Sequence, residues 1–424
     1  MSSSLHIHIG GAGVKIGDML WKLYEKEYNE TTQKTYIYEE VDGNHYPQAL
    51  FFDTDDRIIH EVQKNTSIKF KNKSFLHAKE DASTHCRGWY IVGDTILLEA
   101  LDYIRKKIET MDRLEEIVIT NSISGGTGSG FLCRLVYEIT EYVKRKVKIH
   151  GFMIFPSSEM CNSTVEIYNT IDASQALIEY FHSITIFDNQ SMYNVIDHQL
   201  GLDFVDYQHL NNVVSQIISS YTGLRRFNNS DNSKFLSNLC PYPYMHFLIP
   251  QYGQMTLIND YTRKELKQEQ FIKFLSKVEQ KLYQCPKSPN YIATALLFRQ
   301  KQLNSFYGKF DLILKNFDHY FGQSPNIFQC QSSNYQVLPE LAQMKQTGTF
   351  FSNDASIVSR FKLLTRKFDI LYRKRAFVHW YVGQGQEANM LMEQRESFGD
   401  LIADYEDFKV AENLPIESQN DDEF

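Results

Sequence analysis

The chain has 424 residues, of which 42% are hydrophobic and 23% are charged, and its formal net charge is -8 at pH 7. These values are typical of a soluble globular protein with two or three domains, and the negative charge argues against a nucleic acid or an anionic membrane as the main partner. The six cysteines form no CxxC pair, so we expect reduced thiols in the cytoplasm rather than a disulfide or zinc framework. We expect neither a signal peptide nor a membrane span, because no apolar run approaches the roughly 20 residues that cross a bilayer.

The first element that the sequence predicts is a strand, Leu5 to Ile9, which runs into the glycine-rich turn Gly10-Gly11-Ala12-Gly13. Apolar residues at helical spacing follow, namely Ile16, Leu20 and Leu23. The amino end of such a helix favours a phosphate, because its first amides are unpaired and its dipole is positive there. A dinucleotide-binding fold is the alternative, although the spacing Gly11-x-Gly13-x-x-x-Gly17 does not match the GxGxxG pattern.

A polar segment and a second strand come next. Tyr28 to His45 predicts a surface loop. Pro47 to Asp53 predicts a strand that is followed by a second acid, Asp55. Acids at the end of a strand are common turn formers, so by themselves they indicate only a loop. Ile91 to Ile108 predicts a helix with its apolar residues on one side.

The most informative stretch is Ser122-Ile123-Ser124-Gly125-Gly126-Thr127-Gly128-Ser129-Gly130, which follows the apolar run from Ile117 to Ile119. A helical pattern comes directly after it, formed by Leu132, Leu135, Val136, Ile139 and Val143. Glycines let the backbone approach an anion closely, so this order of strand, turn and helix predicts a phosphate cradle. The stretch lacks the Gly-Lys-Ser/Thr ending of a Walker A loop, and a tight turn without a ligand is the alternative.

Strands and helices continue to alternate after the cradle. Val147 to Phe155 predicts another strand, and the alternation through about residue 205 predicts a parallel sheet that helices cover on both faces. Leu210 to Tyr221 predicts a core helix that stops at Gly223. Near the end, Ile357 to Leu371 and about Glu387 to Phe408 predict two antiparallel helices, the first of them capped by Ser352 or Asn353.

Four stretches of the chain resemble the tubulin family. His8 to Gly17, which reads His-Ile-Gly-Gly-Ala-Gly-Val-Lys-Ile-Gly, is similar to the opening of a tubulin. Ser124 to Gly130 is similar to the glycine loop of the tubulin and FtsZ superfamily, and Lys79 to Ala82 reads Lys-Glu-Asp-Ala as tubulins do. The most specific match is Lys374 to Gly383, Lys-Arg-Ala-Phe-Val-His-Trp-Tyr-Val-Gly, which resembles the α type in particular.

The resemblance implies an α/β fold of the tubulin/FtsZ kind. It consists of a Rossmann-like domain with a parallel sheet, an α+β intermediate domain and a carboxy-terminal helical pair. The implied boundaries are residues 1–205 for the nucleotide-binding domain, 206–224 for a central helix, 225–350 for the intermediate domain and 351–410 for the helical pair. We expect residues 411–424 to be a short disordered acidic tail, because they are polar and end in Asp-Asp-Glu-Phe.

The resemblance also implies a site for GTP and Mg²⁺. The matching residues on the phosphate side are Gly10, Gly11, Ala12, Gly13, Asp81, Ser122, Gly125, Gly126, Thr127 and Gly128. The matching residues near the sugar are Asn162 and Glu166, those at the base are Asn189, Tyr207 and Asn211, and Asp55 is on the magnesium side. An asparagine amide suits the guanine edge, because it both donates and accepts hydrogen bonds.

Three residues on the phosphate side depart from the family pattern, and Lys15 replaces a second glutamine, near the base. Gly11 stands in place of a glutamine that touches phosphate and magnesium, Thr84 replaces an asparagine, and Ser124 replaces the first of three glycines. A serine at residue 124 is tolerable only if the backbone there does not need a positive φ. The lost glutamine removes hydrogen bonds worth about 1.5–3 kcal/mol each when they are charge-assisted, which predicts weaker nucleotide binding and leaves an empty site as the alternative.

A divergent α-type tubulin is expected to be a cytoskeletal GTP-binding subunit that pairs with a β-tubulin-type partner. Other tubulins of a microtubule lattice, motors and microtubule-associated proteins are its further implied partners. Lys234 stands where α-tubulins have a glutamate that activates water against the neighbouring subunit's nucleotide. Because an ammonium group cannot act as a general base, we expect no stimulation of hydrolysis. The alternatives are a non-polymerising regulator that binds tubulin partners, and an independent nucleotide hydrolase, for which the sequence offers no convincing acid.

Overall fold

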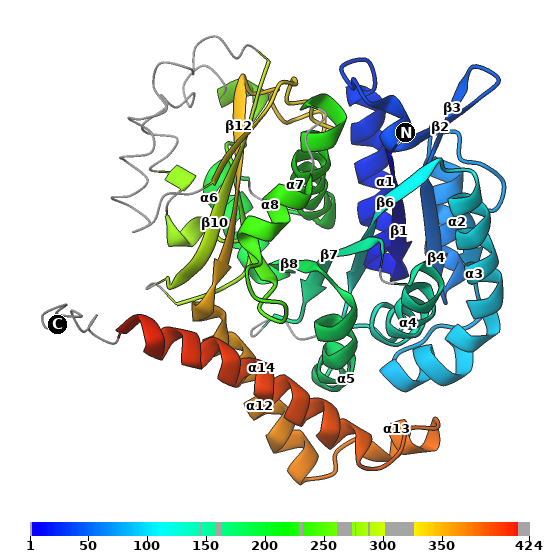
Figure 1. The fold of residues 1–424 in the computed structure, drawn as a ribbon, viewed down its shortest axis with the longest axis vertical. Coiled ribbons are helices and arrows are strands. Elements are labelled where there is room, and N and C mark those ends of the chain that lie inside the picture. The colour runs from blue at the N-terminus through cyan, green and yellow to red at the C-terminus, as the bar shows by residue number, and fades with distance from the viewer. Residues whose placement is uncertain are drawn as a thin grey trace, which may run out of the picture.

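A computed structural model describes residues 2–144, 146–157, 163–202, 204–228, 232–260, 274–275, 277–286, 289–301 and 326–413. Within these residues the core is one large sheet of ten strands, in the order β11-β10-β12-β9-β8-β7-β6-β1-β4-β5 (Figure 1). Helices pack on both faces of this sheet. The α/β class that the alternation predicts is therefore confirmed.

The amino-terminal half of the sheet is parallel. Its strands are β5 (Phe75–His77), β4 (Ala49–Asp53), β1 (Ser2–Ile9), β6 (Arg113–Ser122), β7 (Lys148–Phe155) and β8 (Ser183–Asp188). β1 pairs with both β4 and β6, so that Ile7 lies opposite Leu50 on one side and Ile119 on the other. The chain leaves β1 toward β4 and later returns to β6 on the opposite side. This reversal makes a topological switch point at the carboxyl ends of β1 and β6, where open α/β sheets bind ligands.

Two hydrophobic cores lie against the two faces of the sheet. One face is covered by α3 (Val92–Glu109), α4 (Leu132–Val143) and α5 (Val165–Tyr180). The other face is covered by α1 (Gly10–Glu27), α2 (Asp56–Asn65), α6 (Asn189–Leu200) and α7 (Tyr207–Asn228). The helices predicted from residue 91 and after the cradle are α3 and α4, and each follows a π-helical turn, η2 (Arg87–Ile91) or η3 (Thr127–Phe131).

The remaining strands extend the same sheet. β9 (Phe247–Gly253) joins β8 through two residue pairs, and β12 (Gln346–Asp354), β10 (Tyr291–Gln300) and β11 (Asn326–Cys330) follow outward. β12 is antiparallel to both of its neighbours. α8 (Asn232–Leu239) packs against β10 and β12. Strands from both implied domains thus share one sheet, and the boundaries at residues 205 and 225 stay predictions.

Two buried ion pairs that share one carboxylate connect α1 with α7 and β10. Glu27, the last residue of α1, accepts hydrogen bonds from Arg226 Nη1 of α7 at 2.8 Å and from Arg299 Nη2 of β10 at 2.6 Å. Ser219 Oγ donates to the same carboxylate at 2.8 Å, and all four side chains are buried. Burial by itself raises the pKa of Glu27, but the two guanidinium groups and these hydrogen bonds outweigh it and hold the pKa below its ordinary value.

Two local predictions are wrong. α7 runs through Gly223, where a stop was expected, because this glycine makes room for the ring of Phe227: a Cβ there would lie 3.3 Å from Phe227 Cδ2. The expected loop from Tyr28 to His45 contains a hairpin of β2 (Tyr38–Val41) and β3 (Asn44–Pro47). Asp42 and Gly43 have φ values of +52° and +74°, which is the left-handed pair that a two-residue hairpin turn requires.

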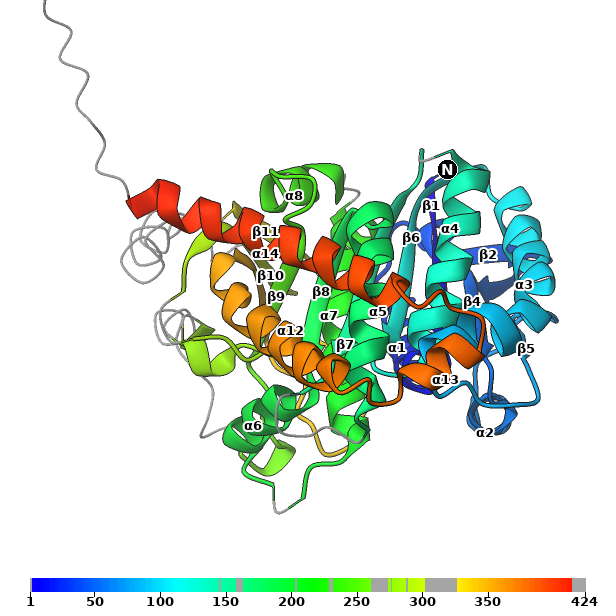
Figure 2. The ribbon, with the colours of Figure 1, turned by 90° about the horizontal axis from the view of Figure 1, so that it is seen from below.

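The carboxy-terminal helices α12 (Val358–Arg373) and α14 (Met390–Asn413) lie side by side (Figure 2). They are antiparallel as predicted, because Lys362 pairs with Glu406 while Asp369 pairs with Arg395. A short helix that the sequence did not indicate, α13 (Val378–Gly383), connects them. Both long helices pack over α5 and so add a second layer to one face of the parallel sheet.

The predicted cap of the first of these helices is wrong by one or two residues. Asp354 accepts a hydrogen bond from the amide of Ser356 at 2.9 Å, and the chain enters α12 through the 3-10 turn η7 (Ala355–Ile357). Ser352 and Asn353 lie in β12, with both side chains buried. The strand therefore extends further than its sequence indicates, and its last residue supplies the cap.

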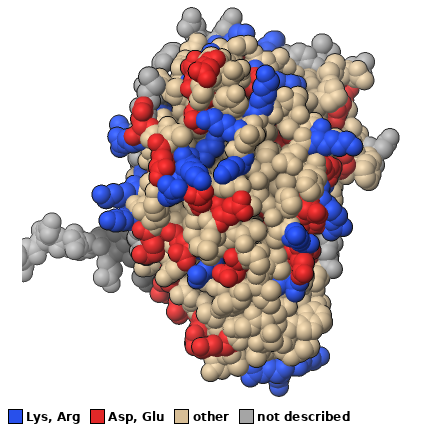
Figure 3. Space-filling model, turned by 90° about the vertical axis from the view of Figure 1, so that its right-hand side faces the viewer, with Lys and Arg blue, Asp and Glu red and all other residues tan. Residues whose placement is uncertain are grey.

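The face of the molecule that carries α2 and α3 has basic and acidic side chains intermixed (Figure 3). On α3, for example, Arg105 pairs with Asp102 and Glu109. A mixed surface of this kind gives this face no single-sign patch for a polyanion. Among the helices that the structure describes, none combines the length and the apolar character that a bilayer span requires.

Candidate functional site

A cavity of about 310 Å³ lies at the switch point of the sheet. Its walls come from the carboxyl ends of β1, β4 and β6, from the starts of the helices that follow, and from the segment after β5. The residues that line it are Ile9, Gly10, Gly11, Ala12, Asp53, Asp55, Ile58, Asp81, Ala82, Ser83, Ser122, Gly125, Gly126, Thr127 and Gly128. The two glycine-rich turns, far apart in the sequence, thus face each other across one cavity, which we call the phosphate cavity.

Two glycines of the cradle are required by close backbone contacts. A Cβ on Gly126 would lie 2.3 Å from the carbonyl oxygen of Thr84, and a Cβ on Gly128 would lie 2.0 Å from the carbonyl oxygen of Ser122. An alanine at either position must therefore displace the backbone that forms the cavity wall. Gly10 has a φ of +71°, which glycine adopts readily and which lets α1 begin directly at the end of β1.

Two helix starts open on the cavity. Gly10 and Gly11 begin α1, and Thr127 and Gly128 begin the turn η3 that leads into α4. The first backbone amides of a helix have no partner within it and carry partial positive charge, so both starts offer donors to an anion. The turn before α4 is held in shape by Ser129, whose Oγ donates to the carbonyl oxygen of Gly125 at 2.7 Å. This arrangement fits a chain of phosphate groups.

One buried asparagine holds the cradle against its neighbours. Asn169 Nδ2 donates to the carbonyl oxygens of Ser124 at 2.8 Å and Ser83 at 3.1 Å. Its Oδ1 accepts from the amide of His85 and from Tyr381 Oη, each at 2.7 Å. The sequence analysis allowed a serine at residue 124 only if the backbone there does not need a positive φ. Ser124 does not have one, so this requirement is met. Asn169 therefore ties the cradle to the segment after β5 and to α13.

Three carboxylates line the cavity, those of Asp53, Asp55 and Asp81. Asp53 is 3% exposed, and its Oδ1 accepts from the amide of Thr54 at 2.8 Å, whereas its Oδ2 has no partner among the described residues. Burial raises the pKa of Asp53 to about 7, against the lowering effect of the backbone amides of Asp55 and Thr54. An unpartnered carboxylate oxygen beside a phosphate site suits Mg²⁺, which proteins hold through one or two carboxylates together with phosphate oxygens.

The ligands of such a metal do not come from the protein alone. In the part of the chain that the structure describes, no group of three or more His, Cys, Asp or Glu side chains is arranged to hold a metal ion. A magnesium ion at Asp53 and Asp55 would therefore depend on phosphate oxygens for the rest of its coordination.

Asp55, the residue predicted for the magnesium side, pairs with Arg57. Asp55 Oδ1 caps α2 by accepting from the amide of Arg57 at 3.0 Å, and Oδ2 accepts from Arg57 Nε at 2.9 Å and Nη2 at 2.6 Å. Hydrogen bonding from the Arg57 side chain lowers the pKa of Asp55. The arginine is 80% exposed, so a cation in the cavity and this guanidinium compete for the same carboxylate. Sequence reasoning missed Arg57, although its position two residues after a predicted metal ligand was visible.

Thr54 was also not predicted from the sequence. Its Oγ lies 2.5 Å from Thr127 Oγ and accepts from the amide of Ala82 at 3.2 Å. These contacts brace the end of β4 against the cradle. They join residues that are far apart in the chain, so no local pattern could have indicated them.

The residues predicted for the sugar and the base do not line the phosphate cavity. Glu166 lies in the first turn of α5, Asn189 and Tyr207 begin α6 and α7, and Asn211 follows one turn later. Tyr207 is 55% exposed. Asn162 lies outside the described residues. The phosphate-side residues are thus brought together, apart from Gly13, which packs behind the wall against the carbonyl oxygen of Thr120, while the sugar and base assignments stay predictions.

Lys234 lies on α8 with its side chain exposed. The next residue, Phe235, is 1% exposed and packs its ring against those of Phe328 and Phe351, at centroid distances of 5.2 and 5.5 Å. This packing fixes the direction of the short helix, so that the lysine faces outward.

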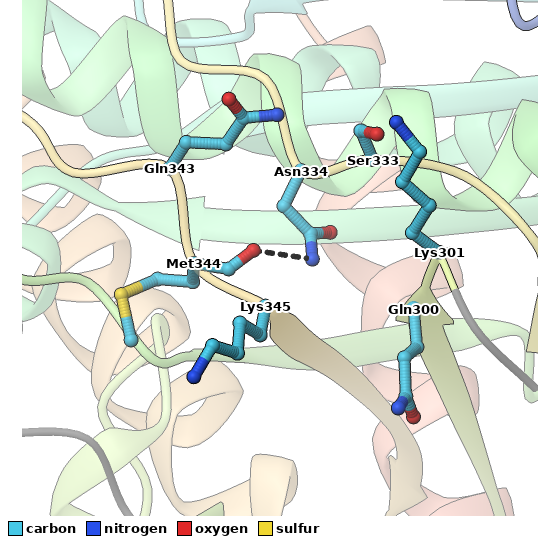
Figure 4. A pocket seen from close by; sticks show the side chains of 7 residues that line it. All are labelled: Gln300, Lys301, Ser333, Asn334, Gln343, Met344 and Lys345. Atoms are coloured by element: carbon cyan, nitrogen blue, oxygen red, sulfur yellow. Dashed lines mark hydrogen bonds between the residues drawn. The ribbon is translucent and has the colours of Figure 1, made fainter. Parts of the chain in front are cut away.

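A second cavity, of about 370 Å³, lies between the end of β10 and the segment before β12 (Figure 4). It is lined by Gln300, Lys301, Ser333, Asn334, Gln343, Met344 and Lys345. The amide of Asn334 is engaged in holding these segments together, because it donates to Met344 O at 3.1 Å and accepts from Thr347 Oγ at 2.6 Å. The lining includes no carboxylate and no predicted site residue, so this cavity shares none of the features that the sequence predicts for a nucleotide site.

Comparison with known proteins agrees with this geometry. Residues 3–197, which include both glycine-rich turns, match the model of the Tubulin/FtsZ family, GTPase domain. The Tubulin alpha-2 chain of Eleusine indica is 31% identical over 454 residues, which cover 100% of this chain and 99% of that protein. The Tubulin alpha-3 chain of Zea mays is 31% identical over 438 residues, which cover 96% of each chain. The similarity therefore extends beyond the GTPase domain to the carboxy-terminal helices.

Proposed function

The chain belongs to the tubulin family, and on that premise we propose that it is an α-type microtubule subunit that holds one GTP with Mg²⁺ and pairs with a β-tubulin-type partner. The observation that carries the proposal is the phosphate cavity. It combines two helix starts, two glycine-rich turns and an unpartnered carboxylate oxygen at the switch point of the sheet.

Each wall of the cavity has its own task in this proposal. The amides at the starts of α1 and η3 donate to phosphate oxygens, and Gly126 and Gly128 let the backbone segments of the cavity wall pack closely together. Asp53 and Asp55 hold the magnesium ion, which neutralises phosphate charge when it is bound. The sugar and the base extend toward Glu166, Asn189, Tyr207 and Asn211.

We also propose that this subunit does not stimulate GTP hydrolysis in the adjoining β-type subunit. Lys234 is exposed on α8, where it is available to a neighbouring subunit. An exposed ammonium group cannot remove a proton from water as a carboxylate does. A lattice that contains this subunit should therefore keep the GTP of the adjoining β-type subunit for longer.

The nucleotide part of the proposal is tested by denaturing the natively purified protein, together with its partner, and identifying the guanine nucleotide released. Gly128→Ala places a Cβ 2.0 Å from the carbonyl oxygen of Ser122 and should lose the nucleotide of this subunit. Gly383→Ala is the matched control, because its Cβ meets no atom within 4 Å, and it should keep one GTP more than Gly128→Ala. Equal nucleotide content in the two variants refutes the proposal.

The polymer part is tested with Lys234→Glu in mixed microtubules. Faster phosphate release per incorporated subunit is expected, while Lys64→Glu, which reverses the charge of an exposed lysine on α2, should leave the rate unchanged. Equal rates in the two variants would contradict the role of Lys234. Complexes with the β-type partner that never enter filaments would instead identify the chain as a non-polymerising regulator.

A further inference from the structure

A cavity of about 280 Å³ lies apart from the phosphate cavity, between α4, α5 and the start of α14. Figure 2 shows α14 crossing α5 in this part of the molecule. Its lining includes His85, Trp89, Arg134, Asp172, Gln386 and Gln394. None of its lining residues lines the phosphate cavity. We call it the α5–α14 cavity.

A relay of amides leaves one buried acceptor in this cavity without a donor. Gln175 Nε2 donates to Glu179 Oε1 at 2.8 Å, which fixes the orientation of the Gln175 amide. Gln175 Oε1 then accepts from Gln394 Nε2 at 2.8 Å. The Gln394 amide is therefore oriented too, and its Oε1 is buried without a hydrogen-bond partner among the described residues. A buried acceptor without a donor costs about 1–3 kcal/mol, so a missing partner is expected.

A second set of contacts leaves a ring nitrogen of His85 buried without a hydrogen-bond partner among the described residues. Asp172 Oδ1 accepts from Gln386 Nε2 at 2.6 Å, and Gln386 Oε1 accepts from the thiol of Cys86 at 3.0 Å. Asp172 Oδ2 lies 3.9 Å from His85 Nε2. Burial lowers the pKa of His85, which favours the neutral ring, and the nearby carboxyl group favours the tautomer with the proton on Nε2. In that tautomer His85 Nδ1 is an acceptor, and it too is buried without a partner among the described residues.

The remaining walls favour a cation. Aromatic rings of Trp89, Tyr90 and Tyr137 line the cavity, and aromatic faces attract cations. The acidic lining residues are Glu179 and Asp172, whose pKa burial raises, against one guanidinium, that of Arg134. This guanidinium is already engaged, because it lies 5.8 Å from the Trp89 ring centroid and 3.1 Å from Glu138.

We propose that the α5–α14 cavity binds a small organic cation of the guanidine or alkylamine class. Its N–H groups donate to Gln394 Oε1 and His85 Nδ1, and its charge is met by Asp172. Both unsatisfied atoms are acceptors and the lining has two carboxyl groups against one guanidinium, so a donor-rich cation supplies what the cavity lacks, whereas an anion or a ligand without N–H groups does not. The proposal is independent of the nucleotide site, with which this cavity shares no lining residue.

The test is calorimetric titration of the natively purified full chain with butylguanidinium, compared with butylurea, an uncharged probe of nearly the same shape. We expect butylguanidinium to bind at least tenfold more tightly. Asp172→Asn and Gln394→Leu should each weaken its binding by at least fivefold, with an unchanged circular dichroism spectrum and urea unfolding midpoint as the measure of intact folding. Asp369→Asn, which removes an exposed carboxylate of α12, is the matched control and should bind as the wild type does.

Three outcomes overturn the proposal: equal affinity for the two probes, full binding by both variants, or no binding of butylguanidinium at all, which would mean that Arg134 of the chain itself fills the cavity. If Asp172→Asn fails to fold, the comparison of the two probes and the Gln394→Leu variant still decide the question.

Discussion

Ile58 fills the space beside Gly11: a Cβ built on residue 11 would lie 2.5 Å from Ile58 Cδ1. Both residues line the phosphate cavity. Where tubulins carry a glutamine, this chain thus has a glycine together with an isoleucine that occupies the place of the missing side chain. The two residues are complementary, and neither is expected to change freely without the other.

This relationship predicts a coupling between two substitutions. Gly11→Gln alone should lower the free energy of unfolding by up to about 1 kcal/mol, because the end of the half-buried Ile58 side chain must move aside. In an Ile58→Val background, which lacks Cδ1, most of that loss should disappear, with a coupling energy of about 0.5–1 kcal/mol. Urea unfolding of the four proteins of the cycle measures it. If Gly11→Gln costs the same in both backgrounds, Ile58 is not the obstacle.

The pairing of Arg57 with Asp55 predicts an altered response to magnesium. Arg57→Thr frees Asp55 Oδ2 but leaves the backbone cap of α2 in place. The Mg²⁺ concentration that half-saturates nucleotide retention should fall by about 2- to 5-fold, as expected for the loss of an exposed competing pair. Arg105→Thr, which breaks exposed pairs on α3, is the control and should leave this concentration unchanged. An unchanged value in Arg57→Thr would show that Asp55 does not hold the metal.

The buried carboxylate of Glu27 predicts a large loss of stability on neutralisation. Glu27→Gln leaves Arg226 and Arg299 buried without a countercharge and should cost about 3–5 kcal/mol of the free energy of unfolding at pH 7. Glu25→Gln, a change of a half-exposed glutamate on the same helix, should cost less than about 0.5 kcal/mol. Chemical denaturation compares the two variants, and similar costs would contradict a tightly paired site.

The same glutamate gives this loss a defined pH dependence. The pKa of Glu27 in the folded protein lies below the ordinary value of 4.5. Its contribution is therefore fully present above pH 4.5 and is lost as the pH falls through the folded pKa. The difference between wild type and Glu27→Gln should shrink in acid, and a difference that grows below pH 4.5 would reverse the assigned sign.

The four hydrogen bonds of Asn169 predict that Asn169→Leu and Tyr381→Phe differ in both stability and nucleotide release rate. Asn169→Leu leaves the partner groups of Ser83, Ser124 and His85 unsatisfied, so it should cost more than about 3 kcal/mol and speed nucleotide release. Tyr381→Phe removes only one partner and should cost about 1 kcal/mol without changing the release rate. Denaturation together with the dissociation rate of a fluorescent nucleotide measures both effects. Equal release rates in the two variants would contradict the link to the cradle.

Much of the parallel half could be predicted from local pattern. β1, β7, α3 and α4 lie where apolar periodicity places them, because each element buries one face of its own sequence. The hairpin of β2 and β3 was missed although Asp42-Gly43 is a turn pair that hairpins favour. The stop expected at Gly223 failed because packing against Phe227, and not backbone freedom, determines the glycine there.

The site was predictable where it is local in sequence and unpredictable where it is not. Each glycine-rich turn could be recognised from the sequence, because it stands between a predicted strand and a predicted helix. In the structure both turns line one cavity. Three other features depend on side chains that come together only in the folded protein. They are the contact of Thr54 with Thr127, the packing of Ile58 beside Gly11 and the pairing of Arg57 with Asp55. No spacing rule encodes such contacts.

Helix α1 extends from the phosphate cavity to the buried carboxylate of Glu27. One end of it forms a wall of the phosphate cavity, and the other end, about 27 Å away for 18 residues, is clamped through Glu27 to α7 and to β10. Because α1 is buried against its neighbours along its length, one rigid element has its first residues at the cavity and its last residue in the buried cluster with Arg226 and Arg299.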